Sequence, residues 1–384
     1  MDFDLPEELK MLKDTVRRFV DKELIPVEKD TCILEEMKPH YQEHFEKRAK
    51  ELGIWQYDVP VEYGGSGMPI LARVVLWEEF SRSVGLPARG DGITGPSPRR
   101  ALYMLDGEMK EKYLLPVLRG EKKTCFAQTE PDAGSDPGAM RTSAVKDGNG
   151  YVVNGVKRFI TGAGKADFIQ LLAATDKGKG SRGGISMFLV DMDTPGVKLT
   201  TQYETMMGDR PWEIVLENVR VPASNLVGDE GEGMAFGQEW INIGRVKHGA
   251  HSCGVAERCL ELATTYAKQR STFGQPLAHR QGVQWMLADM YVELQAARML
   301  VYKTAWRMDR GEEAREDAYV CKFYADEMAF RAADKCMQIH GGIGLTTDLP
   351  IEKMWRQQRS FRITEGATEV MKMVIARHVL KTYA

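Results

Sequence analysis

The spacing of apolar residues changes twice along this 384-residue chain, and no other feature limits the possible folds as strongly. Up to about residue 122, apolar side chains recur at helical spacing, as in the stripe from Leu9 to Leu24. From about 123 to 232 the period shortens toward two, which is typical of strands, and from 233 onward helical spacing returns. The pattern predicts an N-terminal α-helical domain (1–122), a β-domain (123–232) and a C-terminal helical domain (233–384).

Short strands are predicted in the middle region, each bounded by Gly, Pro or Asp. They cover residues 168–173, 185–190, 197–200 and 213–221. Residues 151–160 carry an Asn154-Gly155 pair between apolar positions, and this pattern predicts a hairpin that turns at the pair. Such strands and turns indicate a small antiparallel β-barrel or sandwich.

The C-terminal region shows four long amphipathic segments with short joins between them. They cover residues 234–269, 281–310, 313–340 and 350–382. Long helices connected in this way are typical of an up-and-down four-helix bundle. The predicted fold class is therefore α+β multidomain, with a helical domain first, a β-barrel or sandwich in the centre and a four-helix bundle last.

The two charge signs nearly balance, since the chain has 52 Lys and Arg, 55 Asp and Glu, and a net charge of −3. This balance gives no support for a nucleic-acid or anionic-membrane partner. No apolar run approaches the length of a membrane span, and no signal peptide is evident at the start. The six cysteines form no CxxC pair and the seven histidines do not cluster with them, so no metal site is expected. We expect a cytoplasmic protein of bacterial type, with a processed mitochondrial matrix protein as the alternative.

A carboxylate followed by a glycine, Glu365-Gly366, interrupts the helical pattern near the C-terminus. Glycine lets the backbone turn without a Cβ clash, so Glu365 could point into a cavity. A carboxylate in an apolar cavity has a raised pKa, which suits it to take a proton from carbon. A surface glutamate in a helix–helix turn explains the same residues, so both interpretations stay open at this point.

Three other segments contain residues suited to ligand binding. Residues 129–136 combine hydroxyls with backbone N–H groups that could donate to an anionic ligand, although a structural proline or Asx turn has the same composition. Arg270 and Phe273 could hold a pyrophosphate and cover an apolar ring, or could belong to a helix end that Gly274 caps. Residues 338–344 are rich in glycine but lack the preceding strand that a Rossmann dinucleotide site requires.

In their order and spacing, these motifs resemble the acyl-CoA dehydrogenase family of flavoproteins over essentially the whole chain. The matching segments are TEPDAGSD (129–136), YVVNGVKRFITGAGKADF (151–168), RSTFG (270–274), QIHGGIG (338–344) and ITEGATEV (363–370). Two further segments, PVEYGGSGM (60–68) and LENVRVPASNLVG (216–228), agree with the resemblance. One such motif would carry little weight, but five in register with the helix–β–helix periodicity support it together.

The resemblance implies that FAD is bound non-covalently without a Rossmann fold, its ring lying between the β-domain and the bundle. By match, the residues expected to contact the flavin ring and ribityl chain are Gln128, Thr129, Ser135, Phe159 and Thr161. The residues expected to reach the FAD of a neighbouring subunit are Arg270, Phe273, Gln281, Gln338, Gly341 and Gly342. A homo-oligomer is therefore expected, either a dimer or a dimer-of-dimers homotetramer.

The resemblance also implies an activity, namely the oxidation of an acyl-CoA thioester to a trans-2-enoyl-CoA. Glu365 would remove the α-proton while the β-hydride passes to flavin N5, and the electrons would go on to an electron-transfer flavoprotein. The backbone N–H of Glu365 would help to polarise the thioester oxygen. Ser135, Arg245 and Gly366 are expected to contact the substrate.

Some family members carry the base on the first bundle helix, directly before a shared arginine. That arginine corresponds to Arg245, and the preceding residue is Gly244, which cannot act as a base. Thr364 stands where an aromatic residue often precedes the base, so the acyl pocket should differ there in shape and polarity. The chain length and branching of the acyl group stay open.

Three alternatives within the same scaffold are less well supported. Acyl-CoA oxidases are usually much longer, and flavin monooxygenases of this fold typically lack a carboxylate at the position of Glu365. A non-catalytic relative that contacts DNA would normally carry a more basic surface, whereas residues 233–384 hold 21 Lys and Arg against 17 Asp and Glu. An acyl-CoA dehydrogenase is therefore the function we expect.

Overall fold

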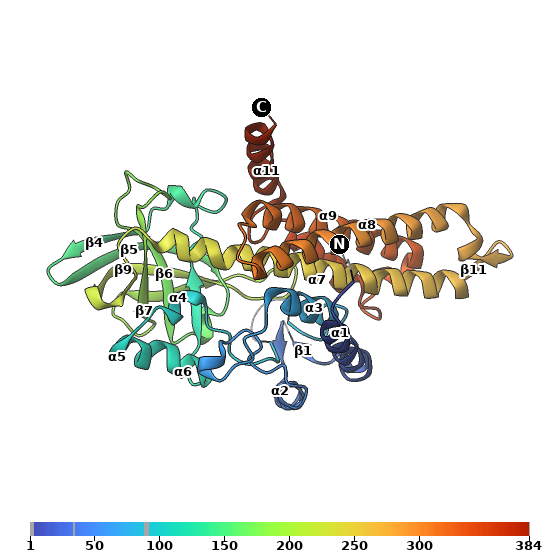
Figure 1. Ribbon diagram of the computed structural model, residues 1–384, viewed down its shortest axis with the longest axis horizontal. Helices are drawn as coiled ribbons and strands as arrows, with labels where there is room; N and C mark the ends of the chain where they lie inside the picture. The colour runs from blue at the N-terminus through green and yellow to red at the C-terminus, as the bar shows by residue number, and fades with distance from the viewer. Residues whose placement is uncertain (1–3, 34, 88–91, 384) are drawn as a thin grey trace. The chain divides into compact units, whose positions relative to one another are not determined.

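The computed structural model describes residues 4–33, 35–87 and 92–383, and of Ile33 and Glu239 only the backbone. Figure 1 shows that helices dominate both ends of the chain and that a sheet occupies its middle. The chain forms two compact units: unit 1 comprises Met1–Gly53, Gly67–Ala88 and Asn242–Ala384, and unit 2 comprises Ile54–Ser66 and Arg89–Ile241. Unit 1 thus combines parts of the first and the third predicted domain, and the predicted domain boundaries stay a prediction.

Unit 2 is built around one eight-stranded sheet. Its strands are β3 (Thr124–Ala127), β4 (Ser143–Asp147), β5 (Gly150–Ile160), β6 (Phe168–Ala174), β7 (Ile185–Asp191), β8 (Val197–Gln202), β9 (Trp212–Pro222) and β10 (Leu226–Val227). The order is β10-β7-β6-β4-β5-β9-β8, with β3 added to β6. All pairings are antiparallel except those of β3 and β4 with β6. The four predicted single strands are confirmed as β6 to β9.

Strand β6 is buried along its whole length because both of its faces are covered. Leu171 packs in the core on one face, together with residues of β5, β7 and β9. Leu172 packs on the other face with Leu102, Tyr113 and Leu114. These three come from α4 (Arg100–Tyr103) and the π-helical turn Lys110–Leu114, which lead to the short helix α6 (Leu115–Leu118).

The predicted hairpin at residues 151–160 is wrong, because β5 runs straight through this segment. Its pairing with β9 shifts in register between Val153 and Gly155, which marks a bulge and not a turn. A Cβ at Gly155 would lie 2.3 Å from Thr142 Oγ1, so glycine is needed for close approach. The turn lies earlier, at Gly148-Asn149, because Asp147 and Gly150 are paired partners of β4 and β5.

Unit 1 is helical. Its helices are α1 (Glu7–Phe19), α2 (Pro39–Glu51), α3 (Ile70–Phe80), the part of α7 (Gly233–Gln269) from Asn242 on, α8 (Gln281–Asp309), α9 (Arg315–His340), α10 (Ile351–Phe361) and α11 (Thr368–Thr382). Helix α9 packs along α8 and also against α10 and α11, and α3 packs on α1 and α8. The last predicted bundle segment thus forms two helices with residues 362–367 between them. Across the described ranges, none of the helices combines the length and apolar character of a membrane span.

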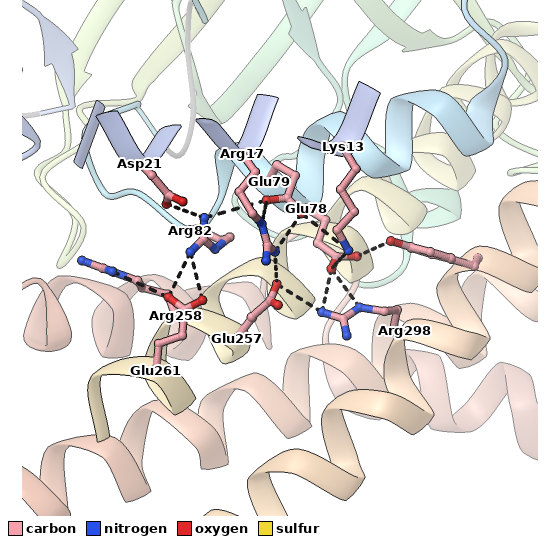
Figure 2. A network of polar contacts seen from close by, with 11 residues as sticks. Lys13, Arg17, Asp21, Glu78, Glu79, Arg82, Glu257, Arg258, Glu261 and Arg298 are labelled. Carbon is pink, nitrogen blue, oxygen red and sulfur yellow. Dashed lines mark hydrogen bonds and ion pairs between the residues drawn. The ribbon is translucent and has the colours of Figure 1, made fainter. Parts of the chain in front are cut away.

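Buried charges join α1, α3, α7 and α8 (Figure 2). Arg17 donates to both carboxylate oxygens of Glu79, at 2.8 and 3.0 Å, and to Glu257 at 2.8 Å. Arg298 donates to Glu78 at 2.8 Å and to Glu257 at 3.2 Å. The three carboxylates offer oxygens within 4.8 Å of one another, as a metal site would, but Arg17, Arg298 and Lys13 already pair with them. The cluster is explained as an ion-pair network that holds the four helices together.

Candidate active site

The loop that carries Glu365 connects α10 to α11 and is fixed at both ends by Glu327 of α9. Glu327 Oε1 accepts a hydrogen bond from Arg362 Nε and another from Thr368 Oγ1, each at 2.8 Å. The backbone N–H of Thr368 also donates to the carbonyl oxygen of Arg362, at 2.9 Å. These bonds close the loop into a compact turn, so that Glu365 at its centre has a defined position.

A buried lysine on the same helix supports the loop from beneath. Lys322 Nζ donates to the carbonyl oxygens of Phe361, at 2.8 Å, and Gly366, at 2.9 Å. It also forms an ion pair with Asp326 at 3.1 Å, one helical turn along α9. Lys322 therefore satisfies two carbonyl groups that the loop leaves without helical partners, while its charge is balanced locally.

The backbone of Glu365 has φ of +54°, a conformation that residues other than glycine rarely adopt. Its side chain is 28% exposed and lies against α7 at Gly244. A Cβ at Gly244 would lie only 2.3 Å from Glu365 Oε2. The glycine at the alternative base position thus leaves the space that the Glu365 carboxylate occupies.

His248 follows Gly244 by one turn of α7 and faces the same carboxylate. Its Nε2 is 3.5 Å from Glu365 Oε1, and its Nδ1 is 3.8 Å from Asp326 Oδ2. Burial opposes the charge of the ring, but Glu365 and Asp326 raise the pKa of His248 above its usual value. His248 was not singled out from the sequence. The available signal was its spacing of four residues from Gly244, because such residues share a helix face.

Arg245 and Gly366, two of the three predicted substrate contacts, lie beside this carboxylate. Arg245 is buried, its guanidinium stacks on the Tyr319 ring at 4.0 Å, and Nη1 donates to Asn242 Oδ1 at 2.8 Å. A Cβ at Gly366 would lie 3.6 Å from Arg245 Nη2. Ser135, the third predicted contact, belongs to unit 2.

The predicted flavin contacts of unit 2 gather where β3 ends beside β5. Gln128 and Thr129 follow β3 directly, and Thr129 accepts a backbone hydrogen bond from Arg158 at 2.8 Å. Phe159 sits at an irregularity in β5 with φ of +58°, and its side chain is 54% exposed. Gln128 Oε1 is buried without a hydrogen-bond partner among the described residues. An exposed aromatic ring and an unsatisfied amide oxygen on these two segments fit a flat, polar ring system such as that of FAD.

A buried ion pair, which sequence reasoning missed, fixes this part of unit 2. Lys157 Nζ lies 2.8 Å from Glu130 Oε1 and 3.1 Å from the carbonyl oxygen of Gln128. Burial lowers the pKa of Lys157 to about 8, against the attraction of Glu130. Glu130 also accepts the backbone N–H groups of Arg141 and Thr142. The pair therefore anchors the predicted loop 129–136, in which Ser135 lies, to β5, which carries Phe159 and runs up to Thr161.

The residues expected to reach a neighbouring subunit's FAD lie at the ends of helices in unit 1. Arg270 follows α7 directly, and Phe273 stands 99% exposed at the tip of the small hairpin of β11 (Ser271–Thr272) and β12 (Gln275–Pro276). Gln281 is the first residue of α8. The hairpin protrudes beyond the ends of α7 and α8 (Figure 1).

The end of α9 lies near the same helix terminus. His340, the last residue of α9, stacks on Tyr266 of α7 at 4.4 Å, and Tyr266 accepts the backbone N–H of Arg270 at 2.8 Å. Gln338 and Gly341 line a shallow pocket together with Asp334, Met337 and Leu345. The structure thus brings the two predicted groups of unit 1 together, while their contact with FAD stays a prediction.

Comparison with known proteins adds an independent line of evidence. Models of the acyl-CoA dehydrogenase N-terminal, middle and C-terminal domains match residues 6–121, 125–219 and 231–380. The chain is 38% identical to a 3-(aryl)acrylate reductase of Clostridium sporogenes, over 98% of this chain and 99% of the relative. It is also 38% identical to the caffeyl-CoA reductase-Etf complex subunit CarC of Acetobacterium woodii, over 98% and 99%. The butyryl-CoA dehydrogenase of Megasphaera elsdenii has a similar structure, with a TM-score of 0.85 at 32% identity over 99% of this chain and 100% of that one.

Proposed function

The chain belongs to the acyl-CoA dehydrogenase family, and we propose that it converts an acyl-CoA thioester to the trans-2-enoyl-CoA with Glu365 as the α-proton base. Members of this family are FAD-dependent oxidoreductases that act on acyl-CoA. The observation that carries the proposal is the Glu365 carboxylate, seated over Gly244 in a loop that Glu327 and Lys322 fix. A carboxylate held in this way is oriented before the substrate arrives.

The protein's own groups would bind, orient and deprotonate the substrate. Glu365 would take the α-proton, and its backbone N–H would donate to the thioester oxygen as charge develops there. Ser135, Arg245 and Gly366 are the proposed substrate contacts. Because the loop has hydrogen bonds to α9 at several points, the carboxylate loses little conformational entropy at the moment of reaction.

The proposed FAD contacts within one subunit are Gln128, Thr129, Ser135, Phe159 and Thr161. When bound, FAD supplies the acceptor for the β-hydride, at N5 of its ring. The residues proposed to reach the FAD of a neighbouring subunit are Arg270, Phe273, Gln281, Gln338, Gly341 and Gly342. A dimer of dimers is the proposed assembly, and the exposed position of Phe273 supports it.

We propose an electron-transfer flavoprotein as the electron acceptor, because one similar protein is a subunit of a reductase–Etf complex. The same comparisons favour a second candidate function, the reduction of a 2-enoyl-CoA in the reverse direction, since three relatives are named as reductases. In that direction Glu365 would donate the α-proton.

The bacterial cytoplasm is the proposed location.

The proposal is tested by mixing the purified holoenzyme anaerobically with a panel of acyl-CoA thioesters. Loss of the visible absorbance of oxidised flavin with one acyl class identifies the substrate, and absence of any loss with every thioester contradicts the proposal. Glu365→Gln should keep FAD and lose this bleaching. The matched control is Glu369→Gln, which changes an exposed carboxylate four residues along and should bleach at the normal rate.

The direction of the reaction is tested with the same protein after chemical reduction of its flavin. Anaerobic reoxidation by 2-enoyl-CoAs that is faster than bleaching by the saturated thioesters would favour the reductase. The opposite ratio would favour the dehydrogenase. Both outcomes should depend on Glu365.

A further inference from the structure

His248 lies on α7 between two carboxylates that come from separate elements of unit 1. One carboxylate, Glu365, faces Nε2 at 3.5 Å, and the other, Asp326, faces Nδ1 at 3.8 Å. The imidazole is 9% exposed, and the ring of Phe361 packs against it at 4.2 Å. With a carboxylate at each nitrogen and little water nearby, the protonated ring is the form that both neighbours stabilise.

Asp326 is held in its ionised form by Ser252 and Lys322 as well as by the histidine. Ser252 Oγ donates to its Oδ1 at 2.8 Å, and Lys322 Nζ lies 3.1 Å from its Oδ2. Burial opposes ionisation, but Lys322 and His248 hold the pKa of Asp326 below its usual value. Since Lys322 balances Asp326, His248 is left as a cation that matches Glu365.

We propose that His248 is a positioning residue for the α-proton base, and that its imidazolium holds the Glu365 carboxylate in place and keeps it ionised. The inference rests on the proposed function, because it takes Glu365 as that base. When Glu365 takes the α-proton and becomes neutral, His248 keeps its own proton, because Asp326 still faces Nδ1. No proton is transferred to or from His248, so its effect on Glu365 is electrostatic.

Other charged groups around His248 limit how strongly this residue alone affects the ionisation of Glu365. On its own helix, Arg245 adds a second positive charge whose field reaches Glu365, and Lys247 is the adjacent residue. His251, one turn farther along, is neutral, because burial lowers its pKa to about 3. Phe361 of α10 contributes no charge. Removal of His248 should therefore shift the ionisation of Glu365 without abolishing it.

His248→Gln tests the inference through the pH dependence of flavin bleaching by a saturating acyl-CoA. A neighbouring cation lowers the pKa of a carboxylate, so its removal should move the acidic limb of the profile about one to two pH units upward. His251→Gln is the matched control, since it removes a half-buried, neutral histidine that also packs against Phe361 at 4.8 Å. Its acidic limb should coincide with that of the wild type, whatever its rate. An unshifted limb in His248→Gln would contradict the proposal.

A second measurement avoids turnover altogether. The histidine rings are labelled with ¹³C, and the resonance of His248 is identified by its absence in His248→Gln. Because the pKa of His248 is raised, its charge persists below that raised pKa and is lost as pH rises through it. The titration midpoint should fall in Glu365→Gln and also in Asp326→Asn. A midpoint that stays the same in Glu365→Gln would overturn the inference.

The two proposals fail in different ways. If Glu365→Gln still bleaches at the normal rate, the assignment of the base is wrong and the role of His248 falls with it. If Glu365→Gln loses bleaching but His248→Gln keeps the wild-type pH profile and Glu365→Gln leaves the histidine midpoint unchanged, only the role of His248 is wrong.

Discussion

Glu365 keeps a left-handed backbone conformation, with φ of +54°, that costs about 1–3 kcal/mol for a residue of this type. Such a conformation persists only where neighbouring bonds enforce it. Here Lys322 holds the adjacent carbonyl of Gly366, and Glu327 holds both ends of the loop. At the scale of single residues, this backbone strain indicates that the fold holds the Glu365 side chain in a fixed position.

Gly244→Ala tests whether the Glu365 side chain needs the space beside Gly244 on α7. The new Cβ would lie 2.3 Å from Glu365 Oε2, so the carboxylate must move. A shift of this kind should lower the rate of flavin bleaching by about 100-fold. Alanine favours a helix by about 1 kcal/mol over glycine, so the melting temperature should not fall because of the helix itself. An unchanged bleaching rate would show that the carboxylate does not use this place in turnover.

At the scale of elements, the ion-pair network of Figure 2 should contribute more to stability than any exposed ion pair. Glu78 is fully buried and accepts bonds from Arg298 and Tyr302, and Lys13 lies 3.7 Å away. Arg298→Met leaves this carboxylate buried with one strong partner fewer. We expect a loss of about 3 kcal/mol in the free energy of unfolding, measured by denaturant titration of the holoenzyme.

Lys335→Gln is the control for this prediction. It removes an ion pair with Asp289, which lies on α8 as Arg298 does but is 62% exposed. Water screens such a pair, so its loss should cost about 0.5 kcal/mol. Equal effects of the two substitutions would mean that the buried network adds nothing beyond a surface pair.

At the scale of the whole molecule, the order of helices and strands could be predicted because apolar spacing follows local geometry. Strands β6 and β7 form continuous buried runs, and the α7–α9 segments keep their helical stripe for many turns. The prediction of a hairpin at Asn154-Gly155 was wrong, because β5 continues through this pair. Its glycine allows the close approach of Thr142, the residue before β4, and a local turn signal does not contain this contact.

The candidate site shows the same limit. Glu365-Gly366 could be recognised from a break in a local pattern, and Gly244 from its position before Arg245. The pairing of Asp326 with His248 could not be recognised from the sequence. The two residues lie 78 positions apart, and only the packing of α9 against α7 makes them neighbours. Burial then decides their charge, and burial cannot be read from either helix alone.

The central claim, that Glu365 is the α-proton base, is tested most directly by proton exchange in the intact holoenzyme. An acyl-CoA that bleaches the flavin is incubated anaerobically with the protein in D₂O, and deuterium at its α-carbon is measured by mass spectrometry. The wild type should incorporate deuterium, while Glu365→Gln should bind the thioester and incorporate none. Incorporation by the variant at the wild-type rate would show that another group removes the proton.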